Sequence, residues 1–395
     1  MDRMSGFGPA DEGSIPSEPV FKMDLEKKRF YSAVSILIGT CIGAGVLGIP
    51  YVASKAGFFV AFAYIIFVGL MMLTVHLYLG EISLRTKSNH QIPGYARKYL
   101  GKKGGHLMEF ATLFGIYSAI VAYILGVGES LSFLIFKEGI YSTLFGVLFS
   151  VLMAGLLWRG MKTLKKFEKI GVGIVLGLLA LIFLIFVKDV NLVNLYYFNI
   201  GNIFLPFGVI LFSLMSFSAI PEVKVVLHKN EKLMKKVLLF GTFIPVVFYI
   251  LFALIVVGYM GASTPQIATL ALGKVFILLG IFTMFTSYLS LGNALQHNFM
   301  FDERMKKRKA WILTALIPIV IFLITRIWDV FSFTKLLGIG GVISAGFSGI
   351  LILIIVKQAK KHGNRKPEYS IPINWFIISL FSLIFILGVI YELFF

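Results

Sequence analysis

The sequence has few charged residues and almost no cysteine. Only 14% of its 395 residues are Asp, Glu, Lys or Arg, whereas 58% are hydrophobic; a typical soluble protein has about 25% charged residues. The single cysteine, Cys41, excludes an intrachain disulfide and a cysteine-based metal cluster. Metalloprotease, phosphate-loop and nucleophile-elbow motifs are absent as well. We therefore expect neither a soluble protein nor an enzyme, and no cofactor.

Long apolar runs fill most of the chain. A membrane-spanning helix needs about 20 apolar residues, and charged clusters separate eleven runs of about that length. The pattern predicts an all-α integral membrane protein with eleven transmembrane helices. Residues 1–30 are expected to form a tail that is disordered at its start. The predicted spans are 31–55, 57–84, 105–136, 140–158, 170–187, 201–223, 237–260, 267–297, 310–326, 330–356 and 371–393.

The net charge of +18 is distributed unevenly between the predicted loops. With the N-terminus in the cytoplasm, 31 of the 37 Lys and Arg residues fall in the tail and the cytoplasmic loops. Basic residues concentrate on the cytoplasmic side of membrane proteins. We expect a multi-pass protein of the plasma membrane with a cytoplasmic N-terminus and an extracellular C-terminus. The charge reflects topology and contact with the lipid bilayer, so nucleic acid is not expected as a partner; the sequence carries no signal for an oligomeric state.

Glycine interrupts the first predicted span. Gly39, Gly43, Gly45 and Gly48 crowd its middle, and Pro50 follows. Glycine weakens a helix, and irregular backbone at membrane depth is tolerated only where it lines a cavity or is buried in protein. The alternative is that the glycines serve helix packing, since Gly39 and Gly43 fit the GxxxG pattern.

The sixth predicted span has a weaker break of the same kind. Three serines, Ser213, Ser216 and Ser218, precede Pro221, whose ring cannot donate a backbone hydrogen bond. Spans five apart run in opposite directions, which is the arithmetic of an inverted repeat. Interrupted helices at matching positions of two repeats point to a transporter's binding site. The expected division is a first five-helix repeat over 31–200, a second over 201–357, and a cytoplasmic loop with an extra helix over 358–395.

Five segments resemble the amino acid/auxin permease family, and most closely its bacterial relatives, the hydroxy/aromatic amino acid permeases. They are GTCIGAGVLGIPYVASKAGF (39–58), LGEISLRTKSNHQIPGYARKYLGKKG (79–104), AYILGVGESL (122–131), SFSAIPEV (216–223) and TSYLSLG (286–292). The resemblance covers the first eight spans in order. It implies the LeuT-type fold of the APC superfamily, with a 5+5 inverted repeat, and secondary transport of amino acids.

The two breaks can bind both ends of an amino acid zwitterion, whose charges must be paired inside the membrane. The free N–H groups that open the second half of the first span suit the carboxylate, and the carbonyls that end the first half of the sixth span suit the ammonium. Gly43 and Gly45 would let the ligand approach the backbone. The N–H donors are Ala44, Gly45 and Val46, and the carbonyl segment runs from Ser213 through Ser216 to Phe217.

The resemblance places the substrate at these same positions. It also puts an aromatic residue of the third span beside the carboxylate, and both Tyr117 and Tyr123 are candidates. The alternative for each tyrosine is ordinary packing with a satisfied hydroxyl.

Hydroxyls in the eighth span form a candidate site for a coupling ion. Thr286 and Ser287 are adjacent, and Thr283 lies one turn earlier. With the carbonyls of Gly39 and Ile42 they would offer the oxygen ligands that Na⁺ takes, and the resemblance supports this site. The alternative is that these hydroxyls bond back to their own helix.

The proton is the other candidate coupling ion. Some proton-coupled relatives carry a lysine in the fifth span where the sodium would sit. The corresponding basic residue here, Lys169, is expected at the cytoplasmic end of that span, which favours sodium.

Acidic residues inside the spans are candidate gates or proton carriers. Glu81 lies near the inner end of the second span, where it can pair with Arg85 or Lys98. Glu129 lies toward the outer surface, and Glu222 follows the proline of the sixth span. Each can instead be a vestibule or structural residue. His76, in the second span, is more typical of a bonded packing residue than of a proton relay.

Together these features predict a symporter that imports a neutral or aromatic L-amino acid by alternating access, coupled to Na⁺ or H⁺. An uncoupled facilitator or exchanger is the first alternative. A transporter-like amino acid sensor is the second, and it would be expected to carry a long cytoplasmic domain or tail.

Overall fold

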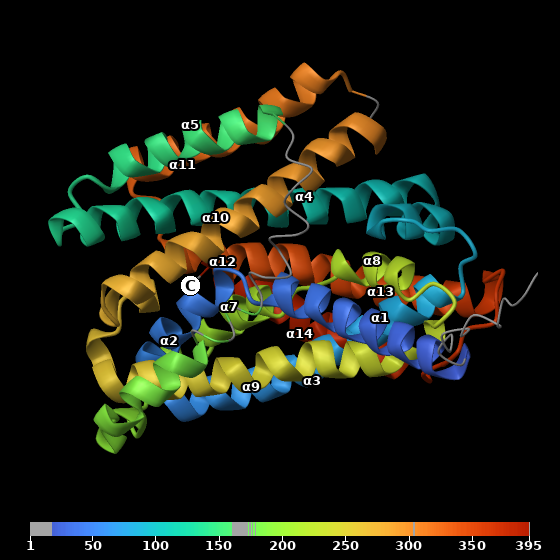
Figure 1. Cartoon of the computed structure of the whole chain (residues 1–395), viewed down its shortest axis with the longest axis horizontal. Helices are drawn as coiled ribbons and strands as arrows, with labels where there is room; N and C mark the ends of the chain where they lie inside the picture. Colours follow the sequence, from blue (N-terminus) through green and yellow to red (C-terminus); the bar gives the residue numbers. More distant parts are fainter. Residues whose placement is uncertain are drawn as a thin grey trace, which may run out of the picture.

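The computed structural model describes residues 18–159, 173, 175, 177, 179–302 and 305–394. All regular secondary structure in these residues is helical, which confirms the predicted all-α class (Figure 1). Within them, eight helices are long and apolar enough to cross a membrane, and one bent pair of helices makes a ninth candidate span. The sixth predicted span is present as two short helices. The fifth, 170–187, lies partly outside the described residues, as does Lys169.

The first half of the chain forms four of the predicted spans, the first of them broken in two. Its helices are α1 (Glu18–Cys41), α2 (Gly45–Ala56), α3 (Phe58–Leu84), α4 (Ile92–Phe136) and α5 (Ser142–Arg159). The chain bends by 51° between α1 and α2, so the break falls at the glycine cluster, as the sequence predicts.

The second half continues with a second broken span. Its helices are α7 (Leu205–Ser213), α8 (Ala219–Val226), α9 (Met234–Met260), α10 (Lys274–His297), α11 (Lys307–Trp328), α12 (Phe333–Gly340), α13 (Phe347–His362) and α14 (Trp375–Phe394). Two π-helices are present in the described residues. The first, η7 (Asn298–Asp302), follows α10, and the second, η8 (Gly341–Gly346), joins α12 to α13. Short 3₁₀ helices in the connections are η1 (Val187–Asp189), η2 (Leu192–Leu195), η3 (Ile200–Asn202), η4 (Glu231–Leu233), η5 (Gly261–Ser263) and η6 (Ala268–Ala271).

Three helices differ in extent from the predicted spans. Helix α1 begins at Glu18, before the predicted span at residue 31, because the Leu, Glu and Lys residues of this segment favour a helix. The eighth span begins at Lys274 rather than at 267, since Gly273 adopts φ 96° and ends the preceding turn. The third span is preceded by a helical segment from Ile92, which Gly101 interrupts with φ 74°.

The helices form two groups (Figure 1). One group contains α4, α5, α10 and α11, which pack on one another along the upper part of the view. The other group contains α9, α3 and the two broken pairs, α1 with α2 and α7 with α8. Helix α12 contacts both groups, through α4 and through α7 and α2. Each group therefore combines helices from both halves of the chain.

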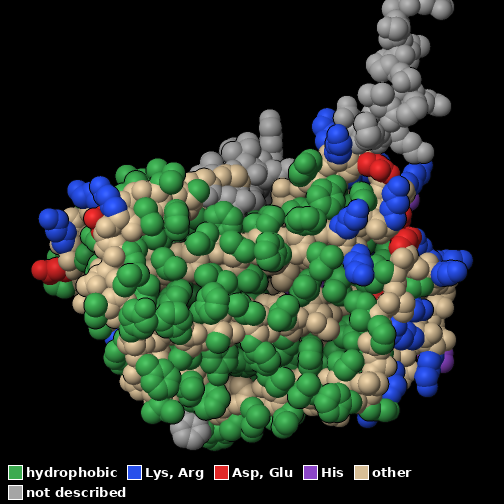
Figure 2. Space-filling model, turned by 90° about the horizontal axis from the view of Figure 1, so that it is seen from below, with side chains coloured by type: hydrophobic (Ala, Val, Ile, Leu, Met, Phe, Trp, Pro, Cys, Tyr) green, Lys and Arg blue, Asp and Glu red, His purple; other side chains and the backbone are tan. Residues whose placement is uncertain are grey.

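The outer surface matches a lipid environment. Figure 2 shows one face of the molecule, where apolar side chains cover the surface between the two ends of the long axis and Lys and Arg gather at the ends, most of them at one end. Large apolar side chains such as Leu70, Val151 and Phe243 are more than half exposed. Such a belt buries its apolar area only in a bilayer.

Candidate functional site

The first break leaves a helix N-terminus without a cap. Residues 42–44 are not helical, and the Gly43 N–H bonds to the Cys41 carbonyl at 2.9 Å. Ala44 occupies the N-cap position of α2, and no side chain within the described residues caps it. The first N–H groups of a helix have no intrahelical acceptor and carry the positive end of its dipole. The start of α2 can therefore receive an anion.

The second break lies just before Pro221, in residues 214–218. Pro221 stands in the first turn of α8, where a missing N–H is harmless. The carbonyl oxygens of Ser216 and Phe217 accept from the N–H groups of Ala219 and Ile220 at 3.1 and 3.2 Å. The start of α8 thus engages these two carbonyls. The carbonyls at the end of α7 are therefore the better candidates to bind the substrate ammonium.

One tyrosine joins the two breaks. The hydroxyl of Tyr249, on α9, lies 2.7 Å from the Cys41 carbonyl oxygen and 2.8 Å from the Ser213 carbonyl oxygen. These carbonyls end α1 and α7, where helix geometry leaves acceptors without partners inside the helix. The sequence alone did not single out Tyr249. A buried tyrosine usually finds a partner for its hydroxyl, so a tyrosine in the middle of a predicted span was the available signal.

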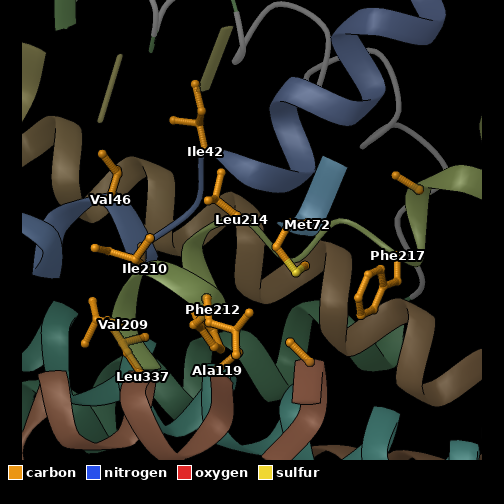
Figure 3. Packing of buried hydrophobic residues seen from close by; sticks show 14 of the residues in the cluster. Ile42, Val46, Met72, Ala119, Val209, Ile210, Phe212, Leu214, Phe217 and Leu337 are labelled. Carbon is orange, nitrogen blue, oxygen red and sulfur yellow. The ribbon is translucent and has the colours of Figure 1, made fainter. Parts of the chain in front are cut away.

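A buried histidine, His76, contacts the second break through Ser216. Both ring nitrogens of the fully buried His76 are engaged, Nε2 with Ser216 Oγ at 3.2 Å and Nδ1 with Thr242 Oγ1 at 3.1 Å. The Phe217 ring packs edge-on against the imidazole. Figure 3 shows Phe217 beside Met72, in the same apolar cluster as Ile42 at the first break. His76 therefore has the contacts of a bonded packing residue.

The glycines of the first break differ in what surrounds them. A Cβ on Gly45 would lie 2.8 Å from the Ser213 Cα, so α2 can approach α7 this closely only with glycine at this position. A Cβ on Gly43 would meet only ordinary contacts, 3.4 Å from Ser287 Oγ and 3.5 Å from the Tyr123 hydroxyl. Packing thus explains why position 45 is a glycine, and its expected role in substrate approach stays a prediction. Gly43 faces polar groups of the other helix group.

A cavity of about 480 Å³ lies between the two helix groups. It extends from the α1–α2 break to the ends of α4 and α10, where Gln91 and Asn298 line it. The predicted ion ligands converge here, because all five line this cavity: Gly39, Ile42, Thr283, Thr286 and Ser287.

The hydroxyls of this cavity also make the bonds of the alternative interpretation. Thr283 Oγ1 donates to the Gly280 carbonyl at 2.9 Å, and Thr286 Oγ1 donates to the Thr283 carbonyl at 3.0 Å. Each oxygen keeps lone pairs for a cation while donating. No group of three or more His, Cys, Asp or Glu in the described part of the chain could hold a metal ion. The predicted ligands are all neutral oxygens.

The structure separates the two candidate tyrosines. Tyr123 is buried and lines the cavity beside the first break. Tyr117 lies elsewhere on α4, and its hydroxyl donates to the Leu313 carbonyl of α11 at 3.2 Å. Only Tyr123 is therefore placed beside the start of α2, while Tyr117 has the bonded packing contact of the alternative.

The first predicted gate residue, Glu81, has more partners than expected. Its buried carboxylate bonds Arg85 Nε and Lys360 Nζ, each at 2.8 Å, and accepts from Ser370 Oγ and the Ile371 N–H. Lys98 is not among these partners. Glu81 thus fastens the 363–374 loop and the end of α13 to the end of α3.

A tyrosine of this loop strengthens the attachment. The Tyr369 hydroxyl donates to the Leu77 carbonyl at 2.7 Å, and burial raises the pKa of this phenol well above its ordinary value. The phenol therefore remains a donor throughout the physiological pH range.

The other two predicted gate residues have different environments. Glu129, on α4, faces Arg326 of α11 at 3.7 Å, and both side chains are partly exposed. This ion pair joins two helices of one group. Glu222 is exposed and lines the cavity. A part in gating or proton transfer stays a prediction for both residues.

Comparisons with known proteins identify a family and a fold for this chain. Residues 26–271 match the tryptophan/tyrosine permease family. The chain is 22% identical to glutamine transporter 2 of Aliivibrio fischeri, over 87% of this chain and 93% of that protein. It is 26% identical to tyrosine-specific transport system 1 of Haemophilus influenzae, over 55% of each. The crystal structure of MhsT with L-phenylalanine superposes with a TM-score of 0.66 at 13% identity, covering 92% of this chain and 97% of MhsT.

Proposed function

The chain belongs to the tryptophan/tyrosine permease family, and from this we propose that it imports a neutral or aromatic L-amino acid by alternating access, coupled to Na⁺ or H⁺. It is a multi-pass membrane amino acid transporter with the fold of MhsT, and not an enzyme. The expected resemblance to aromatic amino acid permeases and the LeuT-type fold are thereby confirmed. The range of substrates is supported by relatives named for glutamine and tyrosine.

The observation that carries the mechanism is the cavity between the two helix groups. It reaches Ile42, in the break that precedes the uncapped start of α2, and Tyr123 lies at its wall. In this proposal the substrate carboxylate binds the N–H groups of Ala44, Gly45 and Val46, and the ammonium binds the carbonyl end of α7. Movement of one group against the other would then open the cavity to either side in turn.

Sodium is the coupling ion that we favour. The five oxygen-bearing positions that line the cavity, from α1 and α10, supply the kind of ligand that sodium takes. Eleven spans in two inverted repeats, with the N-terminus inside, belong to the same proposal. The two helix groups support the repeat, because each group contains helices from the first half of the chain together with the corresponding helices from the second half. The bias of Lys and Arg supports the orientation.

Uptake into proteoliposomes tests this proposal. We expect a labelled amino acid pool to accumulate under an inward sodium gradient and not under a matched potassium gradient at fixed pH. Thr286→Ala combined with Ser287→Ala should abolish the sodium dependence. Ser290→Ala, which changes a hydroxyl lining the same cavity, should preserve it and serves as the control.

Each other outcome selects a different interpretation. Accumulation driven only by a pH gradient would replace sodium with the proton, and equilibration without any gradient would indicate a facilitator or exchanger. Absence of uptake by folded wild-type protein would reject import of these amino acids and favour the sensor.

A further inference from the structure

A buried acid near the C-terminal end of α14 takes no part in the proposed substrate and ion sites. Glu392 lies in the last turns of this helix and is only 4% exposed. Within the described residues its carboxyl group forms no hydrogen bond and no ion pair. An ionisable residue buried in a membrane-spanning helix is costly and marks a functional site by default.

Two glycines on two other helices make room for this carboxyl group. A Cβ on Gly208, in α7, would lie 2.8 Å from Glu392 Oε2. On Gly338, in α12, a Cβ would overlap Glu392 Oε1. The carboxyl group therefore fits a notch between α7 and α12 that exists because both positions lack a side chain.

The charged groups near the notch do not compensate for the hydration that an ionised Glu392 carboxylate would lose on burial. Lys335 of α12 and Tyr391 of α14 act on Glu392 electrostatically. Helix α7 and the π-helix η8 contain no titratable residue, and the basic residues of α13 lie in its last turns, Lys357 to His362. Burying an unpaired charge is strongly unfavourable, so the geometry of the notch suits a neutral, protonated carboxyl group.

The notch depends on closure of one side of the transporter. The helices α2, α7 and α12 pack closely here, since a Cβ on Gly48 would lie 3.1 Å from Leu337 and 3.3 Å from Val209. The cavity instead reaches the opposite ends of α4 and α10. Separation of α7 from α12 would open the side near Glu392, remove one wall of the notch and admit water to the carboxyl group.

We propose that Glu392 is a proton-binding site of the gate formed by α2, α7 and α12: it takes up a proton from outside when the gate closes and releases it when the gate opens. This inference rests on the proposed alternating-access transport. Low external pH then favours closure around bound substrate, and high external pH holds the gate open. The ligand of this site is the proton itself.

The test varies external pH at fixed internal pH in proteoliposomes. Wild-type uptake should fall by up to about tenfold for each pH unit above the titration midpoint, the limit for one proton. Glu392→Gln mimics the protonated form, so its uptake should stay at the acid value of the wild type at every external pH. Glu138→Gln neutralises an exposed glutamate of the loop between α4 and α5 and should behave as the wild type.

Infrared difference spectroscopy on purified protein provides a readout that needs no transport. A pH change should alter a protonated carboxyl band in the wild type and in Glu138→Gln, and this band should be absent from Glu392→Gln. Should Glu392→Gln not fold, Glu392→Asp should keep the band and the pH dependence with a displaced midpoint. An unchanged pH profile in Glu392→Gln, or a band that persists in it, overturns the proposal. If the wild type carries no amino acid, the proposed function fails, and the infrared result alone then decides on the proton site.

Discussion

The hydroxyl of Tyr249 lies 2.7 Å from the carbonyl oxygen of Cys41, at the end of α1. The same hydroxyl lies 2.8 Å from the Ser213 carbonyl oxygen, at the end of α7. A hydroxyl has one proton, so it donates to the two acceptors in turn or shares the proton between them. The breaks of the two interrupted spans are thus held at a common point by a helix that is itself continuous.

Replacement of Tyr249 by Phe should loosen both breaks. It removes the hydroxyl that bonds the Ser213 carbonyl and leaves the Cys41 carbonyl only the Gly43 N–H; a buried unsatisfied group costs about 1–3 kcal/mol. We expect lower thermal stability together with weaker amino acid binding. Tyr288→Phe is the matched control, because the Tyr288 hydroxyl is buried with no hydrogen-bond partner in the described part of the chain. Equal effects of the two changes would show that the bridge has no special part.

Alanine at Gly45 and alanine at Gly43, the two glycines of the first break, should have different effects on stability. Gly45→Ala places a Cβ against the Ser213 backbone, and such overpacking costs about 1–3 kcal/mol; we expect a lower melting temperature and loss of binding. Gly43→Ala meets only ordinary contacts near Ser287 and Tyr123, so the protein should fold normally with altered affinity. Thermal unfolding with and without substrate measures both effects. A stable Gly45→Ala protein that binds normally contradicts the packing argument.

The tyrosines of α4 should separate binding from stability. Tyr123→Phe removes a hydroxyl at the cavity wall and should weaken substrate binding about tenfold, the equivalent of one hydrogen bond. Tyr117→Phe removes the bond to the Leu313 carbonyl and should lower stability by about 1 kcal/mol with affinity unchanged. Binding titrations and unfolding curves on both variants distinguish the roles. The reverse pattern would return Tyr117 to the substrate site.

Glu81 should be a structural anchor of the 363–374 loop. Glu81→Gln removes a buried charge that bonds Arg85 and Lys360, which keep partial contact with water, so we expect a loss of about 1–3 kcal/mol. Glu368→Gln breaks a partly exposed pair with Arg365 and should cost less than about 1 kcal/mol. Limited proteolysis of the loop and thermal unfolding compare the two. Altered uptake by Glu81→Gln with unchanged thermal stability would instead indicate that Glu81 is a gate residue.

The sequence predicts the helices and the breaks well because both depend on local composition. The α1–α2 break falls at the predicted glycines, and Pro221 marks the second break to within a few residues. The oxygens of α1 and α10 that the sequence placed at one candidate ion site, with support from the family resemblance, line one cavity, and their role as ion ligands stays a prediction. Tyr249 and Glu392 were missed, because their importance lies in contacts with residues far away in the chain. Side-chain direction separates Tyr117 from Tyr123, and hydropathy contains no such information.

The cavity reaches the ends of α4 and α10 while the helices near Glu392 are packed shut. In the proposed orientation, which the basic residues favour, this state would face the cell interior. Amino acid that has already accumulated can rebind from within and hold the transporter there. If the protein imports amino acids as proposed, net import would then slow as the internal pool fills, and this would give the cell feedback control of uptake.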